Sequence, residues 1–284
     1  MERQQFIRQH SIIVNSRAAF SKAESNLFYI LISKIPKTGV PNADPISVTA
    51  REVEEFTGSK VNYRQFEGTV NTLSDKKIFV QDQPDKWRKI SMGTVFYYNG
   101  KADFFFDAKA LSYFFELKQF VLADLQTVLA LNSVYARRVY LILKQTEKFG
   151  VRYYKVEDLM EALQVPPSLR VYKGFKNKVL KVALKQIAEH TDLKVKLIEE
   201  KKGRSVYRLQ FRMKRNEDLS LKDWIAFARE RMVGEVIGRA PRNKRQIKIS
   251  TKGLLYYGDG DLETLTKEQS KLLWEYFYNE RVKV

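Results

Sequence analysis

The sequence has no cysteine and only two histidines, His10 and His190, among its 284 residues. Disulfides, thiol catalysis and cysteine-bound zinc are therefore excluded, and a histidine-based metal site or nuclease centre is not expected. A G-x-x-x-x-G-K-[ST] phosphate-binding loop is also missing, which argues against an ATP-driven motor. None of the 15 tyrosines stands in an arginine or histidine cluster that would activate it as a nucleophile. The sequence therefore predicts a protein without catalytic activity, bound metal or cofactor.

Long apolar runs and acidic residues are also scarce. No run approaches the roughly 20 apolar residues that span a bilayer, and the N-terminal MERQQFIRQH has neither the apolar centre of a signal peptide nor a lipidation motif. A cytoplasmic protein without membrane contact is expected. The 33 Asp and Glu accompany 51 Lys and Arg, which leaves a formal net charge of +18. This excess favours an anionic partner, and nucleic acid is a better candidate than a membrane surface.

The length and the 44% hydrophobic content suit two domains of ordinary size. In the first, a helix capped by Ser21 and Glu24 is followed by a short strand, a second helix capped by Thr49 and ended by Gly58, and a third helix, NYRQFEGTVNTLSDK. Three runs of strand composition then predict an antiparallel ribbon: KIFVQDQ, WRKISMGTVFYY and KADFFFD. This order of elements is typical of a winged helix.

The same order of elements returns after residue 131. A helix in NSVYARRVYLILKQTEKFG, a short helix in YKVEDLMEALQV and a long helix in YKGFKNKVLKVALKQIAEH precede a hairpin around the tip KKGR. Matching residues lie at a nearly constant offset, as an internal duplication predicts. The matched pairs are Tyr29 with Tyr140, Val53 with Leu159, Tyr63 with Tyr172 and Phe66 with Phe175. Between the copies, DAKALSYFFELKQFVLADLQTVLAL is dense in apolar residues and predicts a helix packed between the domains.

We therefore predict an α+β protein made of two tandem winged-helix (helix-turn-helix) domains related by internal duplication, plus a C-terminal helical extension. The predicted domains are residues 1–122, 123–215 and 216–284. The extension is not a third copy. It is expected to contain a helix in LSLKDWIAFARERMVGEVIG, a basic loop RAPRNKRQ, and a last helix in TKEQSKLLWEYFYNERV with Thr266 and Gln269 as its capping pair.

The third helix of the second copy has one apolar side and one basic side. The apolar side, whose residues recur at spacings of three and four, is expected to face a core; it consists of Phe175, Val179, Val182, Ala183 and Ile187. The opposite side carries a lysine row with no acid among its members. Between residues 170 and 215, 15 Lys and Arg accompany only four acids. The third helix of a helix-turn-helix unit enters the major groove and a wing lies over phosphates, so this charge lies where DNA binding needs it. A solvated helix face is the alternative.

The predicted DNA-binding residues lie on both copies. In the second copy they are Lys173, Asn177, Lys178, Lys181 and Lys185 on the helix and Lys201, Lys202 and Arg204 on the wing. In the first copy they are Arg64, Gln65 and Asn71 on the third helix, near Gly68, and Arg88 and Lys89 on the expected wing tip DKWRK. An ordinary polar helix face is the alternative for the first copy. Trp87 is expected to pack beneath the ribbon, and His190 to end its helix.

Four segments resemble the second winged helix of the iteron-binding replication initiators of bacterial plasmids: LALNSVYARRVYLILKQTEKFG, YKVEDLMEALQV, YKGFKNKVLKVALKQIAEHTDLKV and KKGRSVYRLQF. The stretch IIVNSRAAFSKAESNLFYILIS is similar to the beginning of their first winged helix, so the resemblance spans residues 12–214. It implies a sequence-specific, double-stranded-DNA-binding protein whose monomers bind origin repeats (iterons), open the duplex and recruit the host initiator and helicase. It also implies homodimers that repress the protein's own gene.

By position, the resemblance gives the recognition role to Lys178, Lys181 and Lys185 and the wing role to Arg204. Two features depart from the family pattern: the first recognition helix is not strongly basic, and the tail after Lys214 has no counterpart. A winged-helix transcriptional regulator without an initiation role is the alternative. Dependence of plasmid replication on the gene and its flanking repeats would separate the two functions.

Overall fold

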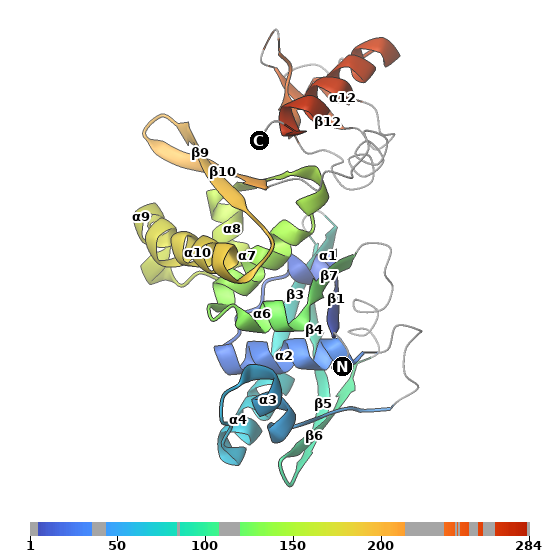
Figure 1. Ribbon diagram of the computed structural model, residues 1–284, viewed down its shortest axis with the longest axis vertical. Helices are drawn as coiled ribbons and strands as arrows, with labels where there is room; N and C mark the ends of the chain where they lie inside the picture. The colour runs from blue at the N-terminus through green and yellow to red at the C-terminus, as the bar shows by residue number, and fades with distance from the viewer. Residues whose placement is uncertain are drawn as a thin grey trace. The chain divides into compact units, whose positions relative to one another are not determined.

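The computed structural model describes residues 5–35, 44–83, 86–107, 120–213, 236–241, 243, 245–249, 255–257 and 265–282 (Figure 1). The chain divides into two units. The first unit comprises residues 1–145 and 153–211, which include nearly all of both winged helices, and the second comprises residues 146–152 and 212–284.

The helices of the first winged helix begin at the residues that cap them. Helices α2 (Lys22–Lys34) and α3 (Ala50–Thr57) both follow complete capping boxes, as predicted at Ser21 and Thr49. Gly58 ends α3 with a φ of 63°, a left-handed conformation that glycine adopts without strain. Because these signals act within a few residues of sequence, the local sequence fixes where each helix starts. Helix α4 (Tyr63–Ser74) follows and is the third helix of the motif.

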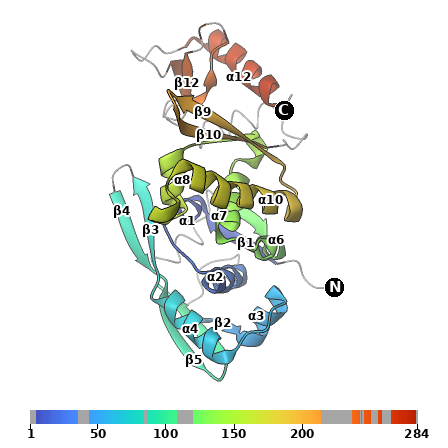
Figure 2. The same ribbon diagram turned by 90° about the vertical axis from the view of Figure 1, so that its left-hand side faces the viewer.

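Helix α2 is the central helix of the first unit. Its residues 27–32 are all buried, although they point in every direction around the helix axis. Figure 2 shows the reason: α2 lies between α6 (Leu125–Ala130) and the pair α3 and α4. Glu24 in its first turn is buried as well. Burial alone would raise the pKa of Glu24, but hydrogen bonds from the Ser21 N–H and from Lys76, 3.0 Å away, lower that pKa below its ordinary value.

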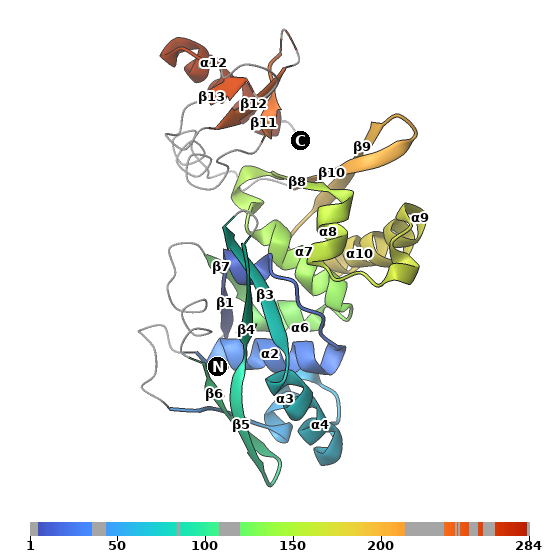
Figure 3. The same ribbon diagram turned by 180° about the vertical axis from the view of Figure 1, so that it is seen from behind.

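The strands after α4 form two hairpins rather than one ribbon. They are β3 (Lys77–Gln83), β4 (Lys86–Ser91), β5 (Gly93–Tyr98) and β6 (Lys101–Phe106). Strand β3 pairs with β4, whereas β5 and β6 join β2 (Ile46–Thr49) in a sheet of order β2-β6-β5. The chain runs on from β4 into β5 (Figure 3) and changes sheet at Gly93, where a Cβ atom would lie 2.1 Å from the Phe105 carbonyl oxygen. The prediction of a single ribbon was wrong.

The wing of the first winged helix is the β5–β6 hairpin. It turns at Asn99 and Gly100, which have φ values of 47° and 74°, the positive values that a type I′ turn requires and that Asn-Gly adopts readily. In the second winged helix the sheet order is β8-β10-β9, so there too the second strand of the wing pairs with the strand before the second helix. By this match the β3–β4 hairpin is an insertion. The prediction that DKWRK is the wing tip was therefore wrong.

The second winged helix repeats this arrangement and confirms the predicted duplication. Its elements are α7 (Val134–Lys144), β8 (Val151–Lys155), α8 (Val156–Ala162), α9 (Tyr172–Phe175), the π-helical turn η3 (Lys176–Leu180), α10 (Lys181–His190), β9 (Val195–Lys202) and β10 (Ser205–Met213). The matched residues Tyr29 and Tyr140 are both buried, and so are Phe66 and Phe175.

The third helix of this copy contains one wide turn. In a π-helical turn the hydrogen bonds span five residues, so one more residue fits into the turn than in an α-helix. Leu180 is consequently buried beside Val179, and Val182 is turned outwards with 39% of its surface exposed. The prediction that Val182 faces the core was wrong. The other four apolar residues are buried as predicted: Phe175, Val179, Ala183 and Ile187.

A strand and a short helix connect the two winged helices. Strand β7 (Phe120–Asp124) pairs antiparallel with β1 (Phe6–His10), and Asp124 then caps α6. Val121 and Ala123 are buried while Leu122 is 43% exposed, which is the alternation of a strand with one covered face. The predicted connecting helix was therefore wrong for 120–124 and correct for 125–130. Its residues 108–119 lie outside the described part of the chain.

Two adjacent arginines of α7 join the second winged helix to the first. Arg137 is fully buried and donates hydrogen bonds to the carbonyl oxygens of Leu131 and Leu129, at 2.7 and 3.1 Å, and to the Ser25 hydroxyl of α2 at 3.0 Å. Because Ser25 belongs to the first winged helix, this single side chain contacts both copies.

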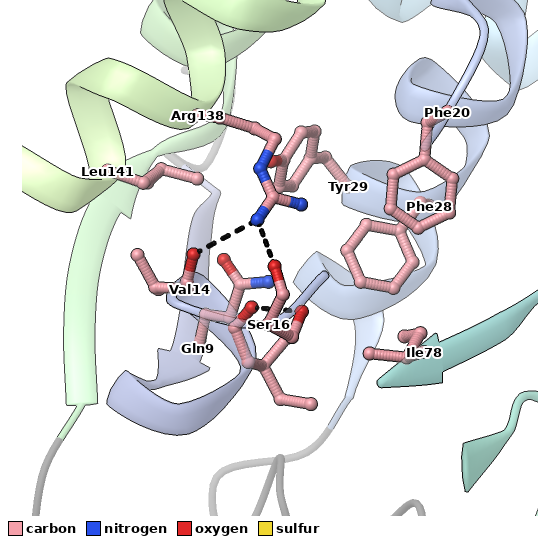
Figure 4. A pocket seen from close by; sticks show the side chains of 10 residues that line it. Gln9, Val14, Ser16, Phe20, Phe28, Tyr29, Ile78, Arg138 and Leu141 are labelled. Carbon is pink, nitrogen blue, oxygen red and sulfur yellow. Dashed lines mark hydrogen bonds between the residues drawn. The ribbon is translucent and has the colours of Figure 1, made fainter. Parts of the chain in front are cut away.

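Arg138 makes a second tie beside it. Its guanidinium donates to the carbonyl oxygens of Val14 and Ser16 (Figure 4) and to that of Ala18 at 3.2 Å, all in the segment that precedes α2. Burial lowers the pKa of both guanidinium groups. A buried cation is costly without hydrogen-bond partners, so these backbone oxygens hold the two winged helices in one arrangement.

The second unit combines a small sheet with a helix. Its elements are β11 (Val236–Arg239), β12 (Gln246–Ile249), β13 (Leu255–Tyr257) and α12 (Lys267–Val282). Phe149, Ile247, Leu255, Trp274 and Phe277 are among the residues of its core. The capping pair at the start of α12 is formed as predicted, with each backbone N–H donating to the other side chain. A helix was predicted over 219–238, but 236–238 is strand and 219–235 lies outside the described residues, so the extension is not purely helical.

Candidate nucleic-acid interface

Elements α9, η3 and α10 form one continuous helix, here called the second recognition helix. Its outer face carries five of the predicted DNA-binding residues. All five side chains are exposed: Lys173, Asn177, Lys178, Lys181 and Lys185. The opposite face is anchored in the core, and the Gln186 side-chain oxygen accepts a hydrogen bond from the Ser133 N–H at the start of α7 (2.9 Å). The lysines therefore stand on a helix that packing holds in place.

The lysines of this face differ in their surroundings. Lys185 Nζ lies 3.8 Å from Glu189, one turn further along the same helix. The expectation that no acid neutralises the row was therefore wrong for Lys185. Within the described part of the chain, Lys178 and Lys181 form no salt bridge. The described residues give Lys173 no salt bridge either, so these three ammonium groups are available to an anionic ligand without the loss of an existing ion pair.

An ion pair ties the second recognition helix to the wing. Lys176 Nζ lies 2.5 Å from the Glu199 carboxylate of β9. Burial would raise the pKa of Glu199, but Lys176 and the neighbouring Tyr172 lower it below its ordinary value. The carboxylate is therefore charged at neutral pH, and its ion pair with Lys176 holds the wing against the helix.

The wing is the hairpin of β9 and β10, and its tip is strongly basic. Lys201, Lys202 and Arg204 are exposed around Gly203, whose φ of 62° makes the tight turn possible. Nearer the base, Arg208 pairs with Glu200 at 2.6 Å, which stabilises the strands below the tip. In Figures 1 and 3 the hairpin extends to the same side of the unit as α9. The basic tip and the N-terminal end of the helix therefore lie on the same side of the unit.

The matching helix of the first copy, α4, presents a polar face with little charge. The predicted residues Arg64, Gln65 and Asn71 are exposed on it. Gly68 stands between them with no atom within 4 Å of the position a Cβ would take. Glycine inside a helix costs roughly 0.5–1 kcal/mol relative to alanine. Packing within the described residues therefore does not require a glycine at this position.

Arg88 and Lys89 lie on β4, outside the wing. Both are exposed, but they belong to the inserted β3–β4 hairpin. Trp87 is 40% exposed, and the Arg17 guanidinium lies 4.0 Å from the centre of its ring. Arg17 also pairs with Glu161 of α8, in the second winged helix. Trp87 thus makes a structural contact, although at the surface rather than beneath a ribbon as predicted. DNA binding by Arg88 and Lys89 stays a prediction.

The described residues contain no group of three or more His, Asp or Glu side chains placed to hold a metal ion. Burial raises the pKa of Tyr29, Tyr135 and Tyr172. A nucleophilic tyrosine needs a lowered pKa, so burial does not activate these three side chains.

His190 is the last residue of α10, as predicted. Within the described ranges, no helix has the length and apolar character that crossing a membrane requires.

The fold agrees with comparisons to known proteins. Residues 6–144 match a family model described as "Initiator Replication protein, WH1", and residues 155–213 match one described as "Initiator Rep protein, WH2". Among solved structures, the chain is similar to the Pi initiator protein in complex with iteron DNA, with a TM-score of 0.63 and 18% identity over 77% of this chain and 100% of that chain. A second similarity, to domains 2 and 3 of RctB, has a TM-score of 0.40 and 9% identity over 74% of this chain and 92% of that chain. No curated protein sequence matches the chain.

Proposed function

Because the chain belongs to the family of initiator replication proteins with WH1 and WH2 domains, we propose that it initiates plasmid replication by binding iterons, the direct repeats of an origin. Membership of an initiator family agrees with the prediction that the protein is not an enzyme. The similar Pi initiator is bound to iteron DNA, which supports repeated sites over a single operator as the target.

The exposed basic surface of the second winged helix is the observation that carries this proposal. The lysines of the second recognition helix meet phosphates at the edges of a major groove, and Asn177 reaches a base edge. The wing tip, with Lys201, Lys202 and Arg204, contacts phosphates beside that groove. A solvated helix face would not need a basic hairpin on the same side.

The first winged helix reads a second groove segment in this proposal. Arg64, Gln65 and Asn71 offer a guanidinium and two amides, the groups that hydrogen-bond to base edges. Gly68 allows the helix backbone to come close to the DNA. Because Arg137 and Arg138 fix the two copies within one unit, we expect the contacted segments to lie on one face of the duplex, about 10 base pairs apart.

The resemblance also supports finer proposals about assembly. Monomers bind the iterons and recruit the host initiator and helicase, whereas homodimers repress the protein's own gene. We divide the chain into an N-terminal winged-helix domain of residues 1–122, a DNA-binding winged helix of residues 123–215 and a third part of residues 216–284.

Hydroxyl-radical footprinting with the full chain on the direct repeats beside its gene tests the proposal. We expect an asymmetric footprint of two protected segments about one helical turn apart. Gln65→Ala should weaken protection of one segment and Lys181→Ala that of the other, so each variant is the control for its counterpart. Protection of one segment only would show that a single copy reads DNA. Binding to an inverted repeat without origin-dependent replication would favour the regulator.

A further inference from the structure

Val171 occupies the N-cap position of the second recognition helix and has no packing role there. Its side chain is 74% exposed, more than the other exposed large apolar side chains of the described residues. Its carbonyl accepts the first helical hydrogen bond, from the Phe175 N–H at 3.0 Å, but a valine side chain has no atom that caps a backbone N–H. The helix therefore starts at Val171 without a side-chain cap.

The first copy shows what this position does when it serves the fold. The residue before Tyr63, which matches Tyr172, is Asn62, and its side chain accepts a hydrogen bond from the Arg64 N–H at 2.8 Å. Ser, Thr, Asp and Asn are the residues that stabilise a helix at its N-cap, and apolar residues are among the poorest. Val171 thus loses a cap and also leaves an apolar side chain in water. Local rules of this kind are broken mainly at functional sites.

We propose that Val171 determines sequence specificity by contacting the C5 methyl group of a thymine in the major groove. The N-terminal residues of a recognition helix are the ones that reach base edges, and the thymine methyl is the apolar group among the edges displayed there. Arg170 and Lys173, both exposed beside Val171, supply the charge that draws this end of the helix to the phosphates. The inference rests on the proposed function, because it assumes that the second recognition helix enters iteron DNA.

Replacing thymine by deoxyuridine removes that methyl group and leaves base pairing unchanged, which gives a direct test. The affinity of the full chain is measured for the cognate repeat and for repeats with one thymine at a time replaced. We expect one replacement to weaken wild-type binding about fourfold, which is the effect expected from the loss of one buried methyl group. For Val171→Ala the same replacement should have little effect. Val182→Ala, which changes another exposed valine of the same helix, should retain the fourfold loss.

A second variant separates specificity from stability. Val171→Asn restores a cap, so we expect its thermal midpoint to rise while its sensitivity to the thymine methyl disappears. An equal response of wild type and both Val171 variants to every replacement would overturn the inference while leaving iteron binding intact. Absence of wild-type binding to any flanking repeat would instead overturn the proposed function, and this inference with it.

Discussion

Lys181 and Lys185 provide a quantitative test of the interface because they differ in one respect. Both are exposed on the second recognition helix, but Lys185 Nζ lies 3.8 Å from Glu189, whereas Lys181 forms no salt bridge within the described residues. Lys181 can contact a phosphate directly. Lys185 must first give up an ion pair, so Lys181→Ala should weaken DNA binding more than Lys185→Ala.

The magnitude for Lys181 follows from counterion release. Each phosphate contact contributes about 0.9 to the slope of log affinity against log salt concentration. Between about 50 and 200 mM salt, wild-type affinity should therefore fall about 3.5-fold more than that of Lys181→Ala. The loss should be similar on cognate and unrelated DNA, since a phosphate contact carries no sequence information. A sequence-dependent loss would assign Lys181 to a base edge.

The magnitude for Lys185 follows from its partner. Exposed helical pairs four residues apart are worth about 0.3–0.5 kcal/mol, or roughly a factor of two in affinity. Glu189→Gln should therefore strengthen DNA binding, and the effect of Lys185→Ala should become about twofold larger in that background. The effect of Lys181→Ala should stay the same in either background.

Fluorescence anisotropy at several salt concentrations measures all of these variants with one labelled repeat. Circular dichroism serves as the control for folding, because all three residues are exposed. Equal salt slopes for wild type and Lys181→Ala would refute the phosphate contact. A change in the Lys181→Ala effect on replacing Glu189 would refute the distinction between the two lysines.

Three further predictions concern the fold and the first copy. Gly68→Ala should stabilise α4 by about 0.5–1 kcal/mol and weaken DNA binding, as thermal unfolding and anisotropy would show; unchanged affinity would mean that α4 stays away from DNA. The pKa of Glu24 is lowered from 4.5 in the fold, so its carboxylate stabilises the protein above pH 4.5. This stabilisation is lost as the pH falls through the lowered pKa. Urea unfolding from neutral to acid pH should therefore show a loss of unfolding free energy that is smaller in Glu24→Gln. Arg137→Met should leave the buried carbonyl groups of Leu129 and Leu131 without the donors that Arg137 supplies, at a cost of about 1–3 kcal/mol each in the free energy of unfolding. An unfolding midpoint equal to that of wild type would contradict the stabilising role of Arg137.

The features predicted well from the sequence are those whose cause is local. Capping boxes involve residues three apart, so Ser21, Thr49 and Thr266 indicated the starts of α2, α3 and α12 without any knowledge of the fold. The exposed basic face and the basic wing tip were also found, because helical and strand periodicity place them opposite the apolar residues.

The errors concern pairing between distant segments. The sequence around residues 84–85 and the Asn99–Gly100 pair are both turn signals, and each predicts a hairpin after α4. Which hairpin is the wing depends on which one pairs with β2, a contact made more than 50 residues away in the chain. The strand character of β7 depends in the same way on its pairing with β1, across more than 100 residues. Apolar composition alone fits either a strand or a helix in such a segment.

The wide turn of the second recognition helix shows a different kind of limit, with a consequence for the site. Val182 lies three residues after Val179, and Leu180 lies three residues before Ala183, so either fits the apolar spacing of the helix. Only the π-helical turn decides that Leu180 is the buried one. Each residue of a π turn rotates the chain around the helix axis by a smaller angle than an α-helical residue does. The side chains of Lys178 and Lys181 are therefore further apart around the axis than two residues three positions apart in an α-helix. Lys181 and Lys185, which follow the wide turn, keep the α-helical alignment. The basic face is therefore broader at its N-terminal end, where Val171 and Asn177 lie, than a single lysine row would be.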